Sequence, residues 1–583
     1  MPPSLYQATF EMKSFAASLI LFCYTLLGLS GKAEANPTCR NIPGSAGFPS
    51  PGTWDALNST VSGRLVKVVP FAKYCHSLPG GACTDEQWTS ALFRSTIPGA
   101  MDQVNWEQSY DSTPPSLCLR NATTCGQGDV PLYSVEAETV ADIQAAVKFA
   151  SKHNLRLAVK STGHDYLGRS TAAHSLLIHT ANMRNITFAD EFLIGNHSVG
   201  SAVTLQSGVH IRDLYQAGKQ NGKIAVSGAA ATVSPAGGYI QGGGHSALSP
   251  TYGLASDNAL EFKMVVANGD LLQVNNMSHP DLFYALRGGG SGSWGVIVSA
   301  TFRTFPTFNA STSIIILAAS NNDAAATLAT VHAQHIFDMD SVRGAQYFYF
   351  LKNSTDTNAP TLLALVSYIP NTTTSQNLAA LTPFLNASLA LPDISLLTQN
   401  LTYGDINDVL LLQADDSVGT NTVLGSRLIP ESTYRDSPAT VGQVYKKLLD
   451  GGSKVILGHM VAGGKVAENA NISSAVTPAW RTAKAHLVLT NDWTDSASLE
   501  EIDTLRKHFQ TEQLPILEAM SGPNAGAYSN EADPLEPDFK TTLFGPNYAK
   551  LSTIKSKYDP ADLFIVAAGV GSERWDESGL CKV

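Results

Sequence analysis

The chain has 583 residues, of which 44% are hydrophobic and 15% charged, and its formal net charge is −11. This length and composition predict a globular protein with more than one lobe and exclude an intrinsically disordered chain. Because the net charge is acidic and no run of Lys and Arg stands out, nucleic acid is not expected as a partner.

The N-terminus predicts a secretory signal peptide. Lys13 precedes an apolar run over residues 15–29, and a small-residue cleavage site ends at Ala35. A retained membrane anchor is the alternative, but the run is shorter than the about 20 residues that span a bilayer. We therefore expect a secreted or vesicular protein with no membrane contact in its mature form. Translation starts at Met1 or Met12.

Cysteines and glycosylation motifs agree with export. Six cysteines remain after removal of the signal peptide, and Cys75/Cys83 and Cys118/Cys125 are close pairs. Disulfides are favoured over unrelated buried thiols, although the connectivity stays open. Cys581 would tie down the C-terminal tail. N-glycosylated surface loops are expected at the Asn-x-Ser/Thr motifs of Asn58, Asn121, Asn185, Asn196, Asn276, Asn309, Asn353, Asn371, Asn386, Asn400 and Asn471.

Beyond the Cys-rich segment, the pattern predicts an α/β unit. Strands are expected over 131–137 and 155–161, joined by a helix that Thr139 and Asp142 cap. This unit delivers "STGHDYLG" at the end of a buried strand, where α/β proteins tend to hold their sites. Strands, a helix and glycine-rich segments follow, including a turn at Asn268-Gly269.

After about residue 310 the pattern changes. Strands expected over 312–320, 346–352 and 361–369 alternate with helical stretches. This alternation predicts a second domain with an antiparallel sheet.

Two glycine clusters indicate a ligand that the backbone approaches closely. Glycine lets a backbone meet a phosphate, and successive N–H groups form an anion nest. Neither cluster matches G-x-G-x-x-G opening a helix or G-x-x-x-x-G-K-[ST], so nicotinamide and P-loop sites are disfavoured. Each cluster alone could be a structural turn, but two in one α/β domain favour a dinucleotide.

Two other kinds of site find little support. His332 and His335 have the spacing of a metal pair on a helix, but no further ligands lie nearby in sequence, so no metal site is expected. The stretch "GSGSWG" around Ser293 misses G-x-S-x-G, which disfavours a serine hydrolase.

Four segments in order carry a family resemblance: "KSTGHDYLGRS", "AGGYIQGGGHSALSPTYGLASDNALEF", "LFYALRGGGSGSWGVIVSATF" and "GPNYAKLSTIKSKYDPADLF". From about residue 126 onward the chain resembles the fungal secreted FAD-linked oxidoreductases of the berberine bridge enzyme-like group, in the vanillyl-alcohol oxidase superfamily.

The resemblance implies an α+β fold. It would combine a PCMH-type two-lobed FAD-binding domain with a substrate domain whose antiparallel sheet is backed by helices. The expected divisions are a signal peptide (1–35), a Cys-rich N-terminal segment (36–125), the FAD-binding domain (126–309), the substrate-binding domain (310–520) and a C-terminal segment returning to the FAD domain (521–583).

The resemblance also implies covalently bound FAD. His164 matches the histidine that bonds to the flavin 8α-methyl carbon in this family. Ala230 stands where doubly attached members carry a cysteine, so a single attachment is expected. The implied cofactor contacts, besides His164, are Ser161, Thr162, Gly163, Asp165, Gly168, Thr232, Gly237, Gly238, Gly242, Gly243, Asp257 and Asn258, with Asn547 and Tyr548 near the flavin ring or the substrate.

The implied activity is that of an oxidase. A small organic substrate, such as an alkaloid or polyketide intermediate, would pass electrons through FAD to dioxygen. The alternatives are a carbohydrate oxidase and a non-catalytic secreted glycoprotein that keeps the fold. The family's tyrosine base does not carry over because Glu531 holds its position. Glu531, Tyr528 and Glu468 are the candidate bases.

Overall fold

The computed structural model describes residues 39–352, 359–411, 413–523 and 525–583. Residues Cys39–Val583 form a compact unit of their own. The predicted signal peptide, its cleavage site and the acceptor Asn353 lie outside the described residues. In the described part of the chain, no helix has both the length and the apolar character needed to span a bilayer.

The N-terminal segment is a set of short helices with two local disulfides. Cys75 bonds to Cys83 and Cys118 to Cys125, which confirms the two close pairs. Because these helices are short, the sequence shows little periodicity here. The elements are α1 (Pro51–Thr60), β1 (Leu65–Lys67), α2 (Phe71–His76), α3 (Asp85–Thr89), α4 (Ala91–Ser95) and the 3-10 turn η1 (Val104–Glu107).

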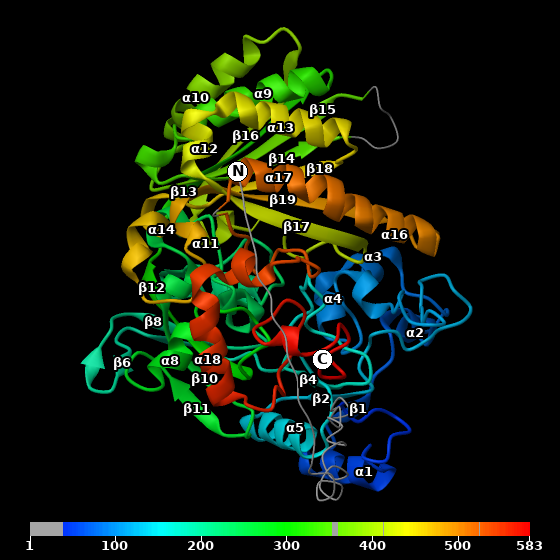
Figure 1. Ribbon diagram of the computed structural model, residues 1–583. Helices are drawn as coiled ribbons and strands as arrows, with labels where there is room; N and C mark the ends of the chain where they lie inside the picture. The colour runs from blue at the N-terminus through cyan, green and yellow to red at the C-terminus, as the bar shows by residue number, and fades with distance from the viewer. Residues whose placement is uncertain (1–38, 353–358, 412, 524) are drawn as a thin grey trace, which may run out of the picture. The chain divides into compact units, whose positions relative to one another are not determined.

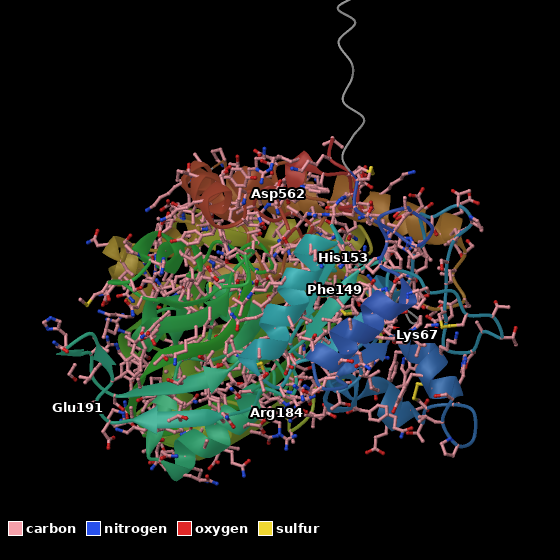
Figure 2. All side chains as sticks on the ribbon, turned by 90° about the horizontal axis from the view of Figure 1, so that it is seen from below. Lys67, Phe149, His153, Arg184, Glu191 and Asp562 are labelled. Carbon is pink, nitrogen blue, oxygen red and sulfur yellow. A yellow bond between two sulfur atoms is a disulfide. The ribbon has the colours of Figure 1, made fainter. Side chains whose placement is uncertain are left out.

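A four-stranded sheet in the order β1-β2-β4-β3 forms the first lobe, and β2, β4 and β3 run parallel. The predicted capping box opens the connecting helix: the Thr139 side chain accepts from the Asp142 N–H, and Asp142 accepts from the Thr139 N–H. Phe149 lies on this helix and His153 at its C-terminal end (Figure 2), and the Phe149 ring packs against Trp54 of α1 with ring centroids 4.8 Å apart. The elements are β2 (Tyr133–Glu136), α5 (Val140–Lys152), β3 (Leu157–Lys160) and β4 (Leu176–His179).

The second lobe is an antiparallel sheet in the order β11-β10-β12-β8-β5, with β9 also paired to β12. Its strands are β5 (Ile186–Ala189), β8 (Ala202–Gln206), β9 (Lys223–Ala225), β10 (Ala259–Val265), β11 (Leu271–Val274) and β12 (Val296–Pro306), beside the small hairpin β6 (Leu193–Ile194) and β7 (His197–Ser198). Its helical elements are α6 (Ile211–Gln220), η2 (Pro235–Tyr239), α7 (Ser249–Tyr252), η3 (Ala255–Asn258) and α8 (Pro280–Ala285).

The remainder is built on a seven-stranded antiparallel sheet in the order β16-β13-β15-β14-β18-β19-β17 (Figure 1). Its strands are β13 (Asn309–Ala319), β14 (Ala345–Leu351), β15 (Thr361–Pro370), β16 (Ile394–Asp405), β17 (Asn421–Pro430), β18 (Val455–Met460) and β19 (Ala483–Trp493). The helices are α9 (Asn322–His335), α10 (Thr374–Leu389), α11 (Ile406–Val409), α12 (Glu431–Asp436), α13 (Pro438–Asp450), α14 (Gly464–Glu468), α15 (Ala479–Thr482), α16 (Leu499–His508) and α17 (Leu514–Ser521). The last helix, α18 (Tyr548–Tyr558), lies beside α8 of the second lobe (Figure 1).

Apart from the edge strand β16, whose residues are mostly exposed, this large sheet is buried on both faces. Phe348 and Leu487 belong to a core shared with α9, α10, α13 and α17, which lie on one side of the sheet (Figure 1). Tyr347, which precedes Phe348 on β14, belongs instead to the core shared with the second lobe. So does Leu428 of β17, which is opposite His486, the residue before Leu487. Since successive side chains of a strand point to opposite faces, one face binds the helices and the other meets the second lobe. The predicted boundary at 309/310 falls at the start of β13.

The third disulfide joins the two ends of the described chain. Cys39 bonds to Cys581 across a separation of 542 residues, and the Arg40 guanidinium lies 4.4 Å from the centre of the Trp575 ring. The C-terminal tail is therefore tied to the N-terminal segment, the arrangement that the sequence had left open.

We expect Cys581→Ser to lower the free energy of unfolding by about 2–5 kcal/mol, because the lost bond restricts the unfolded chain over a long loop. Thermal and urea unfolding measure the loss. Cys83→Ser, which opens a loop with a separation of 8 residues, is the matched control and should cost less. Equal losses in the two variants would contradict this account.

Candidate active site

A cavity of about 220 Å³ lies between the first lobe, the second lobe and the C-terminal segment. Its walls come mainly from four stretches that are distant in sequence: residues within 161–170, 230–241, 291–297 and 528–531. Val159, Thr180 and Ser207 complete the lining. The first two stretches carry the glycine clusters of the sequence, so the structure brings both clusters to one space.

The loop 161–170 follows Lys160, a buried cation that is the last residue of β3. The ammonium group of Lys160 donates hydrogen bonds of 2.7 to 2.9 Å to three backbone carbonyls within residues 97–100. Burial lowers the pKa of Lys160 to about 8 despite nearby carboxylates, among them Asp102. These bonds hold the N-terminal segment against the end of the strand and place Asp102 beside His164.

His164 lies between two carboxylates. Its Nδ1 is 3.1 Å from Asp102 Oδ2, and its Nε2 is 3.5 Å from Asp416 Oδ2 and also contacts the hydroxyl of Thr232. Burial by itself would lower the pKa of His164, but the charges of Asp102 and Asp416 outweigh burial and raise it. The imidazole is therefore held at both nitrogens.

Asp416 links His164 to the second glycine segment. Its Oδ2 accepts hydrogen bonds from the Thr232 N–H at 2.8 Å and from the Thr232 hydroxyl at 2.5 Å. Burial opposes ionisation of Asp416, but its hydrogen bond and ion pair with His164 and the bonds from Thr232 lower its pKa far below the usual range. Asp416 is thus a fixed negative charge.

The C-terminal segment closes the cavity through Asn530. The Asn530 amide donates to the carbonyls of Gly238 and Tyr239 at 3.3 and 3.2 Å. A Cβ at Gly242 would lie 2.4 Å from this amide, so only glycine fits there. Gly242 therefore serves contact between two protein segments.

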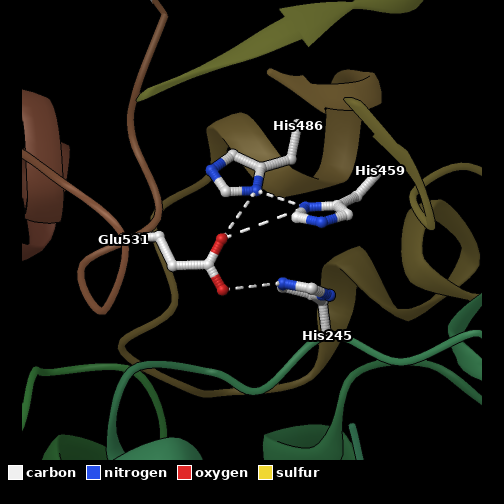
Figure 3. Close-up of side chains that lie close together, drawn as sticks. All are labelled: His245, His459, His486 and Glu531. Atoms are coloured by element: carbon white, nitrogen blue, oxygen red, sulfur yellow. Dashed lines mark hydrogen bonds and ion pairs between the residues drawn. The ribbon is translucent and has the colours of Figure 1, made fainter. Parts of the chain in front are cut away.

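Three histidines surround the carboxylate of Glu531 at the cavity wall (Figure 3). Oε1 of Glu531 is 3.2 Å from His245 Nε2, and Oε2 is 3.5 Å from His486 Nδ1 and 3.9 Å from His459 Nδ1. Burial alone would raise the pKa of Glu531, but His245 and His459 reverse this effect and lower it. The cavity thus carries an ionised carboxylate.

Tyr528 lies beside this cluster. Its hydroxyl accepts from the Asn530 amide at 2.9 Å, and its ring is 5.1 Å from that of His245. Burial raises the pKa of Tyr528 further above its normal value, so the phenol stays protonated.

Comparison with known proteins identifies the family. A family profile described as "FAD binding domain" matches residues 131–275, and one described as "Berberine and berberine like" matches 527–571. An FAD-linked oxidoreductase of Arthroderma benhamiae is 38% identical over 580 residues, covering 96% of this chain and 98% of the relative. This chain belongs to the berberine bridge enzyme-like FAD-linked oxidoreductases.

Further members of this oxidoreductase family match over nearly their whole length. The flavin-dependent oxygenase ucdF of Aspergillus ustus is 34% identical, with 91% of this chain and 98% of the relative covered. The VAO-type flavoprotein MtVAO615 of Myceliophthora thermophila C1 superimposes with a TM-score of 0.83 at 29% identity, covering 94% of this chain and 100% of that one. The expected α+β fold with a two-lobed FAD-binding domain is confirmed.

The cavity suits FAD. Ser161, Thr162, Gly163, His164 and Asp165 line it, as do Gly237 and Gly238. Two further lining atoms, Ser207 Oγ and Gln241 Oε1, are buried without a hydrogen-bond partner among the described residues. Unpartnered buried polar atoms are costly and point to a polar ligand. The oxidoreductase therefore offers both close backbone approach and free hydrogen-bonding groups.

Other residues expected at the cofactor lie outside the lining of this cavity. Asp257 pairs with Arg481 at 2.7 Å, and Asn258 donates to the backbone of Tyr252 and Leu254. These bonds hold the loops that surround the cavity. Gly168, Thr232, Gly242, Gly243, Asn547 and Tyr548 are also absent from the lining, although Thr232 contacts His164 and Gly242 packs on Asn530.

Of the three candidate bases, two line the cavity and one does not. Glu531 and Tyr528 line the cavity. Glu468 is exposed on α14, where it pairs with Arg343 at 2.6 Å, and it does not belong to the lining.

Sequence reasoning missed five residues of the site: Asp102, Asp416, His245, His459 and His486. The "GGGH" motif contains His245 and was a signal for it. The others stand in segments with no distinctive local pattern, and only the fold brings them together.

Because a Cβ at Gly242 meets Asn530, we expect Gly242→Ala to destabilise the protein by about 1–3 kcal/mol and to lower its flavin content. Thermal unfolding and flavin absorbance measure the two effects. Gly52→Ala is the matched control, because a Cβ there meets nothing within 4 Å. A Gly242→Ala protein as stable and as yellow as wild type would contradict the packing role of Gly242.

Proposed function

We propose that this oxidoreductase oxidises a small organic molecule and passes the electrons to dioxygen through FAD bound covalently by His164. The supporting observation is one cavity in which the glycine clusters and His164 lie together with the Glu531 carboxylate. When bound, FAD accepts a hydride from a C–H bond next to oxygen or nitrogen, and dioxygen takes up both electrons and leaves as hydrogen peroxide.

The surroundings of His164 favour a covalent link. Asp102 lies 3.1 Å from Nδ1, and since burial raises its pKa it can receive the imidazole proton, while the ionised Asp416 orients the ring from the other nitrogen. A neutral imidazole is the nucleophilic form. Ala230 lines the same cavity and offers no sulfur, which supports a single attachment.

We expect wild-type protein to stay yellow after acid precipitation, because a covalent bond survives unfolding. His164→Ala should release its flavin into the supernatant. His197→Ala, at an exposed histidine on β7, is the matched control and should keep the flavin in the pellet. A colourless wild-type pellet under a yellow supernatant would exclude the covalent bond, and a protein without flavin would favour the non-catalytic alternative.

The substrate is proposed to be a secondary metabolite such as an alkaloid or polyketide intermediate. A chitooligosaccharide oxidase shares the fold at 18% identity, a similarity that supports the architecture alone. The missing second attachment site at Ala230 argues against the carbohydrate alternative. A panel of alcohols, amines and sugars, assayed by hydrogen peroxide release, distinguishes the classes.

We propose Glu531 as the group that takes the proton from the substrate. Its carboxylate lines the cavity, and the hydrogen bond from His245 fixes its direction. Tyr528, protonated beside it, is suited to donate a hydrogen bond. Glu468 is remote from the cavity.

We expect Glu531→Gln to slow flavin reduction by about 10²–10⁴-fold, because the amide cannot accept the proton. Stopped-flow absorbance with a substrate from the panel measures the rate at equal FAD content. Glu512→Gln, at an exposed position, is the matched control. A wild-type rate in Glu531→Gln would exclude this role, and slow reduction in Glu468→Gln would transfer it.

Export through the secretory pathway is also proposed. Three disulfides join all six cysteines of the described chain. Of the ten acceptor asparagines that the structure describes, nine are exposed and Asn58 is partly exposed. Oxidised cysteines and accessible acceptor sites both fit an N-glycosylated extracellular or vesicular enzyme.

A further inference from the structure

Four potential metal ligands converge beside the cavity (Figure 3). They are His245 Nε2, His459 Nδ1, His486 Nδ1 and a carboxylate oxygen of Glu531, all within 4.8 Å of one another. We propose that these four side chains bind a divalent transition-metal ion.

The distances match those of a metal site. Ligand atoms about 2.0–2.1 Å from a tetrahedral ion lie about 3.3–3.4 Å from one another. His459 Nδ1 and His486 Nδ1 are 3.2 Å apart, and His245 Nε2 is 3.2 Å from Glu531. The other carboxylate oxygen, Oε2, lies 3.5 Å from His486 Nδ1 and 3.9 Å from His459 Nδ1, so the carboxylate has to turn for one oxygen to complete the set of ligands.

The ligands are held in place by the fold. His459 and His486 are directly opposite each other on β18 and β19. They project from the face of the large sheet that meets the second lobe, since their cross-strand partners Tyr347 and Leu428 belong to the shared core. Such a pair needs little ordering before an ion binds.

The other two ligands reach this face from outside the sheet. His245 follows the glycine-rich segment and packs against Tyr528. Glu531 comes from the C-terminal segment, where Ser426 of β17 donates a hydrogen bond to its backbone carbonyl. Three parts of the chain therefore supply the four ligands.

Three imidazoles and one carboxylate suit borderline ions such as Zn²⁺, Mn²⁺ or Fe²⁺. The outward nitrogens of His245 and His486 have no hydrogen-bond partner among the described residues. Such outer partners typically contribute about 10–100-fold in affinity, so we expect an ion that a chelator removes.

The site adjoins the proposed reaction. Glu531 lines the cavity and the three histidines do not, so the ion lies on the side of Glu531 away from the cavity. A carboxylate that binds the ion through one oxygen keeps the other for the substrate proton. The location beside the reaction rests on the proposed function, whereas metal binding itself does not.

The test is Zn²⁺ binding to the purified, chelator-treated holoprotein, followed by calorimetry and elemental analysis. We expect one Zn²⁺ per wild-type chain and at least about tenfold weaker binding for His486→Phe and Glu531→Gln. His332→Phe is the matched control: His332 is also buried and packs on phenylalanines, but it lies outside the cluster, so binding should be unchanged.

The proposal is overturned if wild type binds less than one Zn²⁺ per chain, or if His486→Phe and His332→Phe bind Zn²⁺ equally well. Either result would mean an adventitious ion only. A second readout does not depend on folding of the variants. Cu²⁺ bound to wild type should show nitrogen hyperfine structure in its paramagnetic resonance spectrum, and its absence would also overturn the site. Flavin absorbance is recorded separately, so a colourless chain that binds Zn²⁺ refutes the oxidase and leaves the metal site standing.

Discussion

The buried ammonium of Lys160 is the interaction on which the candidate active site depends. The ammonium group donates hydrogen bonds to three backbone carbonyls of residues 97–100, which take the place of water. Burying a cation without such partners would cost a large amount of folding free energy. Its position at the end of β3 anchors both the loop that carries His164 and the N-terminal segment that carries Asp102. The Asp102 N–H adds a hydrogen bond of 3.2 Å to the Gly163 carbonyl, which ties the two segments together next to His164.

The C-terminal segment gives the second constraint. It passes between the second lobe and the large sheet, where the Asn530 amide bonds to the glycine-rich segment and the Ser426 side chain bonds to the Glu531 backbone. The contact is close enough that Gly242 has no room for a side chain. The cavity therefore depends on one segment that joins the second lobe to the large sheet.

The two constraints create opposite electrostatic settings around one cavity. At His164, one imidazole lies between two carboxylates, and the pKa of the imidazole rises. At Glu531, one carboxylate lies among three imidazoles, and the pKa of the carboxylate falls. The first setting stabilises a protonated imidazole, and since burial raises the pKa of Asp102, this carboxylate is the neighbour that can accept its proton. The second suits a carboxylate that remains ionised beside a substrate or a metal ion.

Features that depend on near neighbours could be predicted from the sequence. The capping box of α5, the strand that ends at Lys160, the local disulfides and the glycine loop with His164 all follow from residues a few positions apart. The order of the motifs was enough to identify the family and its cofactor.

Only the tertiary structure decided which distant side chains meet. Asp102 and Asp416 flank His164, and His459 and His486 become neighbours because β18 pairs with β19. The tertiary structure also shows that Asp257 and Glu468 do not line the cavity, because Asp257 pairs with Arg481 and Glu468 with Arg343. Such contacts depend on strand order and on the path of the C-terminal segment, and these arise from packing of the whole chain, which local residue patterns do not encode.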